Sequence, residues 1–136
     1  MIVTGGYFRQ DADTPYLLSL VRHQVNGDLD STFLASGKGT LDLADNTEDF
    51  PGRFLLQPDD GILTHIASYQ ATHFVVMRFT AAGDLDTGFD TDGIAPTVPG
   101  RALGIAQSGR RAIVVGSAQP APDASQKARV ARFWVH

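Results

Sequence analysis

The segment from residue 83 to residue 93 could carry metal chemistry, because it contains four aspartates: Asp84, Asp86, Asp90 and Asp92. Carboxylate oxygens are the ligands that Ca²⁺ prefers in proteins. The spacing differs from the Asp-x-Asp-x-Asp-Gly pattern of an EF-hand loop, and the terminal glutamate of that loop is missing. An aspartate in a turn also accepts a hydrogen bond from the backbone amide two residues on, and so holds the turn. We expect this structural role and no metal site.

Two arginines each precede an aspartate by eight residues. Arg22 is followed by Asp30, and Arg78 is followed by Asp86. A guanidinium group offers a fork of N–H donors that fits a carboxylate, so the spacing predicts two Arg–Asp pairs. The alternative is that both arginines are solvated. Arg132 ends a third, similar strand, but no aspartate follows it in the sequence; in an assembly of chains its partner would come from another chain.

The four histidines, at positions 23, 65, 73 and 136, show no spacing that is typical of a metal site. His65 and His73 lie near opposite ends of one predicted hairpin and could approach each other across it. Two imidazoles without a third ligand make a poor zinc site, so we expect surface or packing roles. The sequence contains no Gly-x-Ser-x-Gly elbow and no phosphate-binding glycine loop. It therefore predicts no catalytic residue, no metal and no cofactor.

Composition limits the partners of the chain. The 136 residues carry a net charge of −4, and 43% are hydrophobic, which predicts a packed core. Nucleic acids and anionic membranes attract clustered lysine and arginine, so we expect neither as a partner. The absence of cysteine excludes disulfides and thiolate zinc sites. No signal peptide is expected at the N-terminus, and the compartment is not predicted.

Ten short β-rich runs, bounded by Gly, Pro, Asp and Asn, would position these side chains. Helical periodicity is almost absent. Regular spacing and short connections are typical of antiparallel all-β folds such as sandwiches, barrels and propellers. The predicted strands are Ile2–Tyr7, Tyr16–Gln24, Lys38–Leu43, Arg53–Gln57, Ile62–Tyr69, His73–Thr80, Gly93–Val98, Arg101–Gln107, Ala112–Ala118 and Arg129–Val135.

One segment of the sequence occurs twice. Asn26–Phe33 returns as Ala82–Phe89, 56 residues later, and both contain Gly-Asp-Leu-Asp. Gly37 and Gly93 are separated by the same 56 residues. A repeat of this period indicates stacked supersecondary units.

These residues resemble the delta-60 repeat family of bacterial β-propeller proteins. The likeness rests on Leu56–Gly61, Met77–Phe79 and Gly83–Phe89, and it extends over essentially the whole chain. The Gly-Asp-Leu-Asp turn is its most specific element, because the other pieces are common among propellers. The chain departs from the family at Ile62–His65, where the family is more uniformly Val or Ile. The resemblance implies a fold but no particular reaction, because propellers host many functions.

The resemblance implies an all-β fold of β-propeller-type antiparallel blades, about three per chain, in an incomplete ring. A single repeat domain, residues 1–136, would hold a partial blade at 1–43, a blade at 52–98 and a partial blade at 100–136. With the innermost strand named A, the strands would follow the order B-C-D, A-B-C-D and A-B-C. Three blades are too few to close a ring. We therefore expect either a homodimer that completes a six-bladed ring or a fragment of a longer propeller.

The expected function is that of a non-catalytic binding or scaffold module with an unknown molecular target. One alternative is an enzyme or an anion-binding protein with its site in the central channel. Arg53 and Arg101 are the predicted ligand-binding residues of that site, because they begin the two predicted innermost strands. A further alternative is a segment of a larger surface propeller. Trp134, beside Phe133, is interpreted as either an interface anchor or a core residue.

Overall fold

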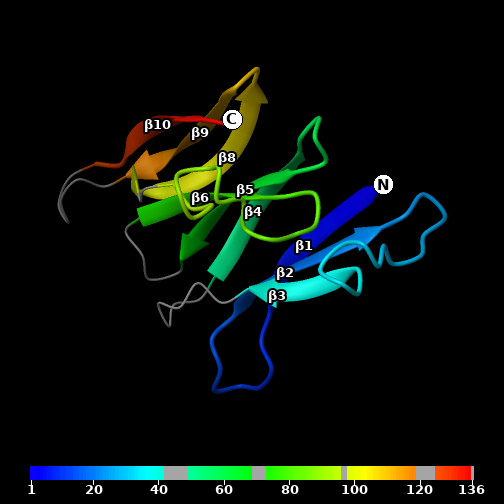
Figure 1. Cartoon of the computed structure of the whole chain (residues 1–136). Coiled ribbons are helices and arrows are strands. Elements are labelled where there is room, and N and C mark those ends of the chain that lie inside the picture. Colours follow the sequence, from blue (N-terminus) through cyan, green and yellow to red (C-terminus); the bar gives the residue numbers. More distant parts are fainter. Residues whose placement is uncertain (42–48, 69–72, 96–97, 119–124, 136) are drawn as a thin grey trace.

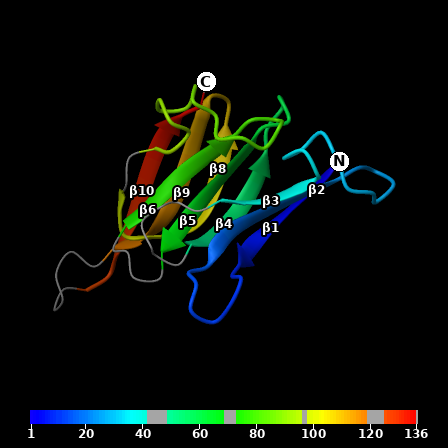
Figure 2. The same ribbon diagram turned by 60° about the horizontal axis from the view of Figure 1, so that its bottom comes forward.

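The computed structural model of the protein describes residues 1–41, 49–68, 73–95, 98–118 and 125–135. These residues form ten strands and no helix, so the predicted all-β class is confirmed. The strands make three antiparallel sheets that lie side by side, as Figure 1 and Figure 2 show. In the part of the chain that the structure describes, no helix is long and apolar enough to cross a membrane.

The strands divide among the sheets as three, four and three. The first sheet has the order β1-β2-β3, where β1 is Ile2–Phe8, β2 is Leu17–His23 and β3 is Lys38–Leu41. The second has the order β4-β5-β6-β7, where β4 is Asp49–Leu56, β5 is Ile62–Ser68, β6 is His73–Phe79 and β7 is Val98–Pro99. The third has the order β10-β9-β8, where β8 is Arg101–Ser108, β9 is Arg111–Ala118 and β10 is Lys127–Trp134. This division matches the predicted order of strands and is consistent with incomplete propeller-like blades.

The core consists of two apolar layers, one on each face of the second sheet. Strands β5 and β6 supply both layers, because successive side chains of a strand point to opposite faces. Ile62 and Met77 pack toward the first sheet, whereas Leu63 and Val76 pack toward the third. The first layer contains Leu18, Leu20, Phe33, Ile62, Ile66, Met77 and Phe79. The second contains Leu63, Phe74, Val76, Phe89, Ala95, Ala102, Ile105, Ala112, Val114 and Val135.

The seventh strand differs most from its prediction. The sequence predicted Gly93–Val98; among the residues of this segment that the structure describes, 93–95 and 98–99, only β7 and an isolated bridge between Ile94 and Met77 are paired. Pro99 has no N–H group to donate to a ladder, which limits pairing at this edge of the sheet. The other nine strands begin and end at most four residues from their predicted bounds. Positions 42–43, 69 and 96–97 of the predicted strands lie outside the described residues.

Candidate functional site

Two connections of the chain have the same backbone conformation. We call residues 24–37, between β2 and β3, the first acidic turn, and residues 80–93, between β6 and β7, the second acidic turn. The amides of Asp30 and Asp86 donate to the carbonyls of Arg22 and Arg78 at 3.0 and 2.9 Å. Left-handed backbone follows at Leu34 and Ala35 in one turn and at Asp90 and Thr91 in the other. The short polar motif shared by the two segments therefore specifies one turn geometry.

Arg22 is buried and ties the first acidic turn to the next sheet. Its Nε donates to Asp30 Oδ2 at 2.9 Å, and its Nη2 donates to the Thr32 hydroxyl at 2.8 Å. Its Nη1 donates to the carbonyl of Ala81, which belongs to the second acidic turn. The guanidinium carbon also lies 4.7 Å from the centre of the Phe33 ring. A single side chain thus joins two turns and caps an aromatic core residue.

The carboxylate of Asp30 is held by Thr32 as well as by Arg22. The hydroxyl and the amide of Thr32 donate to Asp30 Oδ1 at 2.6 and 3.1 Å. These hydrogen bonds, followed by the charge of Arg22, hold the pKa of the Asp30 carboxyl below its ordinary value of 3.8.

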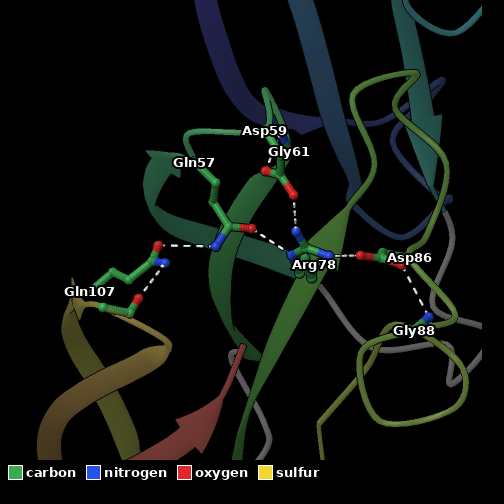
Figure 3. A network of polar contacts seen from close by, with 8 residues as sticks. Gln57, Asp59, Gly61, Arg78, Asp86, Gly88 and Gln107 are labelled. Carbon is green, nitrogen blue, oxygen red and sulfur yellow. Dashed lines mark hydrogen bonds and ion pairs between the residues drawn. The ribbon is translucent and has the colours of Figure 1, made fainter. Parts of the chain in front are cut away.

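Arg78 is the centre of a polar network that crosses from the second sheet to the third (Figure 3). Its Nη1 pairs with Asp86 of the second acidic turn, and its Nη2 pairs with Asp59 of the β4–β5 turn. Its Nε donates to Gln57 Oε1 at 2.5 Å. The Gln57 amide in turn donates to Gln107 Oε1 at 3.0 Å, at the end of β8. Three turns on two sheets are therefore connected through one buried guanidinium.

The two predicted Arg–Asp pairs are confirmed, but the expected fork on one carboxylate is not present. Each aspartate meets its arginine through Oδ2 alone, while its Oδ1 accepts a turn amide: Thr32 N–H for Asp30 and Gly88 N–H for Asp86. The remaining guanidinium nitrogens reach other turns. Sequence reasoning missed these further acceptors, because Ala81 lies 59 positions from Arg22 and Gln57 lies 21 positions from Arg78.

Arg132 differs from its two counterparts. It is exposed, and no hydrogen bond or ion pair joins its side chain to the described residues. It borders a cavity of about 470 Å³ together with Gly88–Thr91, Ala95, Phe133 and Trp134. The Trp134 ring is covered on one face by the Arg111 guanidinium, 4.6 Å from the ring centre. Trp134 is more than half exposed and is not part of either core layer.

Two of the four aspartates in the second acidic turn have the predicted structural role. Asp86 Oδ1 and Asp92 Oδ1 accept the amides two residues on, at 3.0 and 2.9 Å. Asp84 and Asp90 are exposed. Within the described ranges, no three His, Cys, Asp or Glu side chains are grouped so as to hold a metal ion.

His65 and His73 do not approach each other across the β5–β6 hairpin. His65 stands opposite Val76 in the β5–β6 ladder, and His73 lies three residues away on β6, on the other face of the sheet. His65 is buried and receives the amide of Arg53 at Nε2, 3.4 Å away. Its Nδ1 is buried without a partner among the described residues. Burial lowers the pKa of the His65 imidazole below its ordinary value of 6.5.

The structure places Arg53 and Arg101 on neighbouring strands, β4 and β8, with both side chains exposed. Their ladder positions differ. The β4 register shifts between Pro51 and Phe54, so Arg53 lies inside that irregularity. Arg101 stands opposite Ser117 and precedes the corresponding shift in β8. Neither guanidinium group has a side-chain hydrogen bond or ion pair among the described residues.

The fold defines an all-β protein of three antiparallel sheets with strands arranged like those of incomplete propeller blades. No protein-family model matches the chain, and no similar protein was found among curated sequences or solved structures.

Proposed function

We propose that this protein is a non-catalytic binding or scaffold module that presents its turns to a partner. The observation that supports this most directly is the use of its two buried arginines. Arg22 connects a turn of its own sheet directly to the next sheet, and Arg78 does so through Gln57, which donates to Gln107. Buried charges used in this way make a rigid frame for the connections between strands.

The connections β2–β3, β4–β5, β6–β7 and β8–β9 lie along one edge of the sheets, which we call the turn edge; Figure 2 shows it along the top and right of the view. A surface that is already ordered loses little conformational entropy when a partner binds. The entropic cost of binding is therefore small, and the affinity is higher than for a disordered surface with the same contacts. The exposed side chains of the turn edge include Asp28, Asp60 and Asp84. A partner that binds this edge would therefore carry donors or positive charge.

Peptides selected from a random display library on the immobilised protein provide the test. Each selected peptide is titrated into isotope-labelled protein, and the amide chemical-shift changes are mapped onto the chain. We expect the changes to concentrate in the two acidic turns and at residues 57–61. The double substitution Asp28→Asn with Asp84→Asn should weaken binding roughly tenfold or more.

The matched control is Asp13→Asn, because Asp13 is an exposed aspartate in the β1–β2 connection, at the opposite end of these strands. This variant should bind selected peptides as the original protein does. Shift changes that avoid the turn edge, or equal losses in the control and in the double variant, would contradict the proposal.

Anion binding at Arg53 and Arg101 is the second candidate function. It is favoured by the exposure of both side chains on neighbouring strands and by their freedom from partners among the described residues. Inorganic phosphate and citrate serve as probes in a thermal-shift measurement, because a ligand that binds only the folded state raises the apparent stability. An increase in Tm that is lost in both Arg53→Gln and Arg101→Gln would support this function. An increase that survives both substitutions would exclude it.

A further inference from the structure

The outer face of the third sheet is apolar and uncovered. Val130 on β10 and Val115 on β9 stand directly opposite each other, with exposed fractions of 71% and 47%. On β8, Gly104 stands opposite Val115, and Leu103, at the register shift just before it, is 67% exposed. The other face of the same strands carries Val114 and Val135, which are buried against the second sheet. We call Leu103, Val115, Val130, Arg132 and Trp134 the outer face of the third sheet.

The strand pairings show which faces of the first and second sheets correspond to the outer face of the third sheet. Arg22, Arg78 and Arg132 stand opposite Val3, Leu63 and Ile113 in their respective ladders. Two residues before each arginine, on the same face, come Leu20, Val76 and Val130. Leu20 is covered by the second sheet and Val76 by the third, and both are at most 2% exposed. In the first and second sheets, this face is covered by the next sheet along the chain. Val130 lies on the same face of the third sheet.

The first sheet has the complementary uncovered face. Ile2 and Phe8 on β1 are 57% and 51% exposed. Val21 on β2 lies on that face and precedes Arg22 by one residue, as Met77 precedes Arg78. Met77 packs against the first sheet in the core layer that contains Leu20. We define the outer face of the first sheet as Ile2, Phe8, Leu17 and Val21. It corresponds to the Met77 face of the second sheet, which the first sheet covers.

The charges at the two ends of the chain are opposite. Residues 100–136 contain six lysine or arginine residues and one aspartate, a net charge of +5. Residues 1–41, which contain the first sheet and its turns, hold three lysine or arginine residues and four aspartates, a net charge of −1. The excess of basic residues in the third sheet disfavours contact between two third sheets, whereas the outer face of the first sheet carries one exposed cation, Lys38, opposite Val21.

We propose that the outer face of the third sheet packs on the outer face of the first sheet in a second copy of this chain. Two such contacts, related by a twofold axis, would join six sheets in one closed dimer. Arg132 would then donate to the carbonyl of Val25 of the second copy, as Arg22 donates to Ala81 within the chain. Val25 is 90% exposed and precedes the Gly-Asp-Leu-Asp motif by two residues, as Ala81 does. This inference goes beyond the proposed binding function, because the contact is made mainly by sheet faces and meets the turn edge only at Val25.

The mass of the purified chain in solution tests the proposal first. Light scattering over a range of concentrations should give twice the 14.6 kDa of one chain. A monomer at every concentration, or an open series of larger species, would overturn the proposal.

Cysteine cross-linking tests the orientation of the contact, because the chain has no cysteine of its own. Val130→Cys and Val21→Cys are made as separate proteins, mixed and oxidised. A head-to-tail contact predicts a disulfide between the two variants and little disulfide in either alone. Efficient dimerisation of Val130→Cys alone would show that third sheets pack on each other and would overturn the proposal.

The substitution Val130→Lys tests the face without requiring a change in the core, because Val130 is exposed within one chain. It should raise the dimer dissociation constant at least tenfold and leave the circular dichroism of the strands unchanged. The matched control is Leu56→Lys, which replaces a 49% exposed residue of the central sheet and should not change the dissociation constant. Equal effects of the two substitutions would contradict the proposed interface.

Discussion

The first and second acidic turns share a backbone conformation but differ in their surroundings. In the first turn, the amide of Leu34 donates to the carbonyl of Ala82 in the second acidic turn at 2.8 Å. In the second turn, Phe89 and Asp90 border the cavity of about 470 Å³ beside β10. The space beside the second turn is larger than that beside the first, where Leu34 lines a cavity of about 160 Å³. The local sequence therefore specifies the backbone of the turn, whereas the packing of the turn depends on the neighbouring sheet.

The largest expected effect comes from removing the aromatic side chains of the two turns. We expect Phe33→Ala to lower the free energy of unfolding by about 4 kcal/mol, and Phe89→Ala by about 3 kcal/mol. Phe33 is fully buried beneath Arg22. The site of Phe89 adjoins an existing cavity, so its loss creates less new empty volume. Urea denaturation measures both values, and a larger loss for Phe89→Ala would contradict the difference between the turns.

The next effect compares Arg78 with Arg132. Arg78→Met should lower the free energy of unfolding by about 3 kcal/mol, because it leaves the Asp86 carboxylate without its buried partner. Arg132→Met should change it by less than about 0.5 kcal/mol, because its side chain is exposed. Both measurements use protein concentrations at which the chain is monomeric. Similar losses in the two variants would show that Arg132 has a structural partner within the chain.

Alanine substitutions at the equivalent glycines of the two acidic turns should differ in their effect on stability. Gly27 and Gly83 have φ angles of 94° and 97°, so alanine is strained at both. A Cβ at Gly83 would also lie 2.7 Å from Leu34 Cγ of the first sheet, whereas a Cβ at Gly27 meets nothing within 4 Å. We expect Gly27→Ala to cost about 1 kcal/mol and Gly83→Ala about 2 kcal/mol or more. Equal thermal destabilisation would indicate that Leu34 can move aside.

The smallest effect is a pH dependence of stability that arises from His65. The third sheet covers His65, whereas the corresponding residue of the third sheet, Val115, is exposed. Burial lowers the His65 pKa below 6.5, so the unfolded chain binds a proton more readily than the folded chain. Stability should therefore fall as the pH decreases from 6.5 toward the lower, folded pKa, and be unaffected by His65 above that window. His65→Val should remove this part of the pH dependence in urea denaturation at pH 5 to 8. A pH dependence that is the same in both proteins would contradict the role of burial.

Much of the fold and part of the candidate site could be predicted from the sequence. The alternation of apolar residues and the Gly and Asp turns indicated nine of the ten strands with nearly their observed bounds. The spacing of eight residues indicated the Arg22–Asp30 and Arg78–Asp86 pairs, because a strand end and the turn after it are close in the chain. The edge strand β7 was less predictable, since a short edge strand has few ladder bonds to stabilise it.

The all-β class, the strand order within each sheet and the backbone of the acidic turns follow from the amino-acid sequence, because they depend on contacts between residues that are near in the chain. Only the tertiary structure decided that Arg22 reaches Ala81, that Gln57 meets Gln107 and that His65 and His73 are separated. It also decided that Leu20 and Val76 are covered while Val130 is exposed. Residues that look equivalent along the chain acquire different roles because the sheets beside them differ.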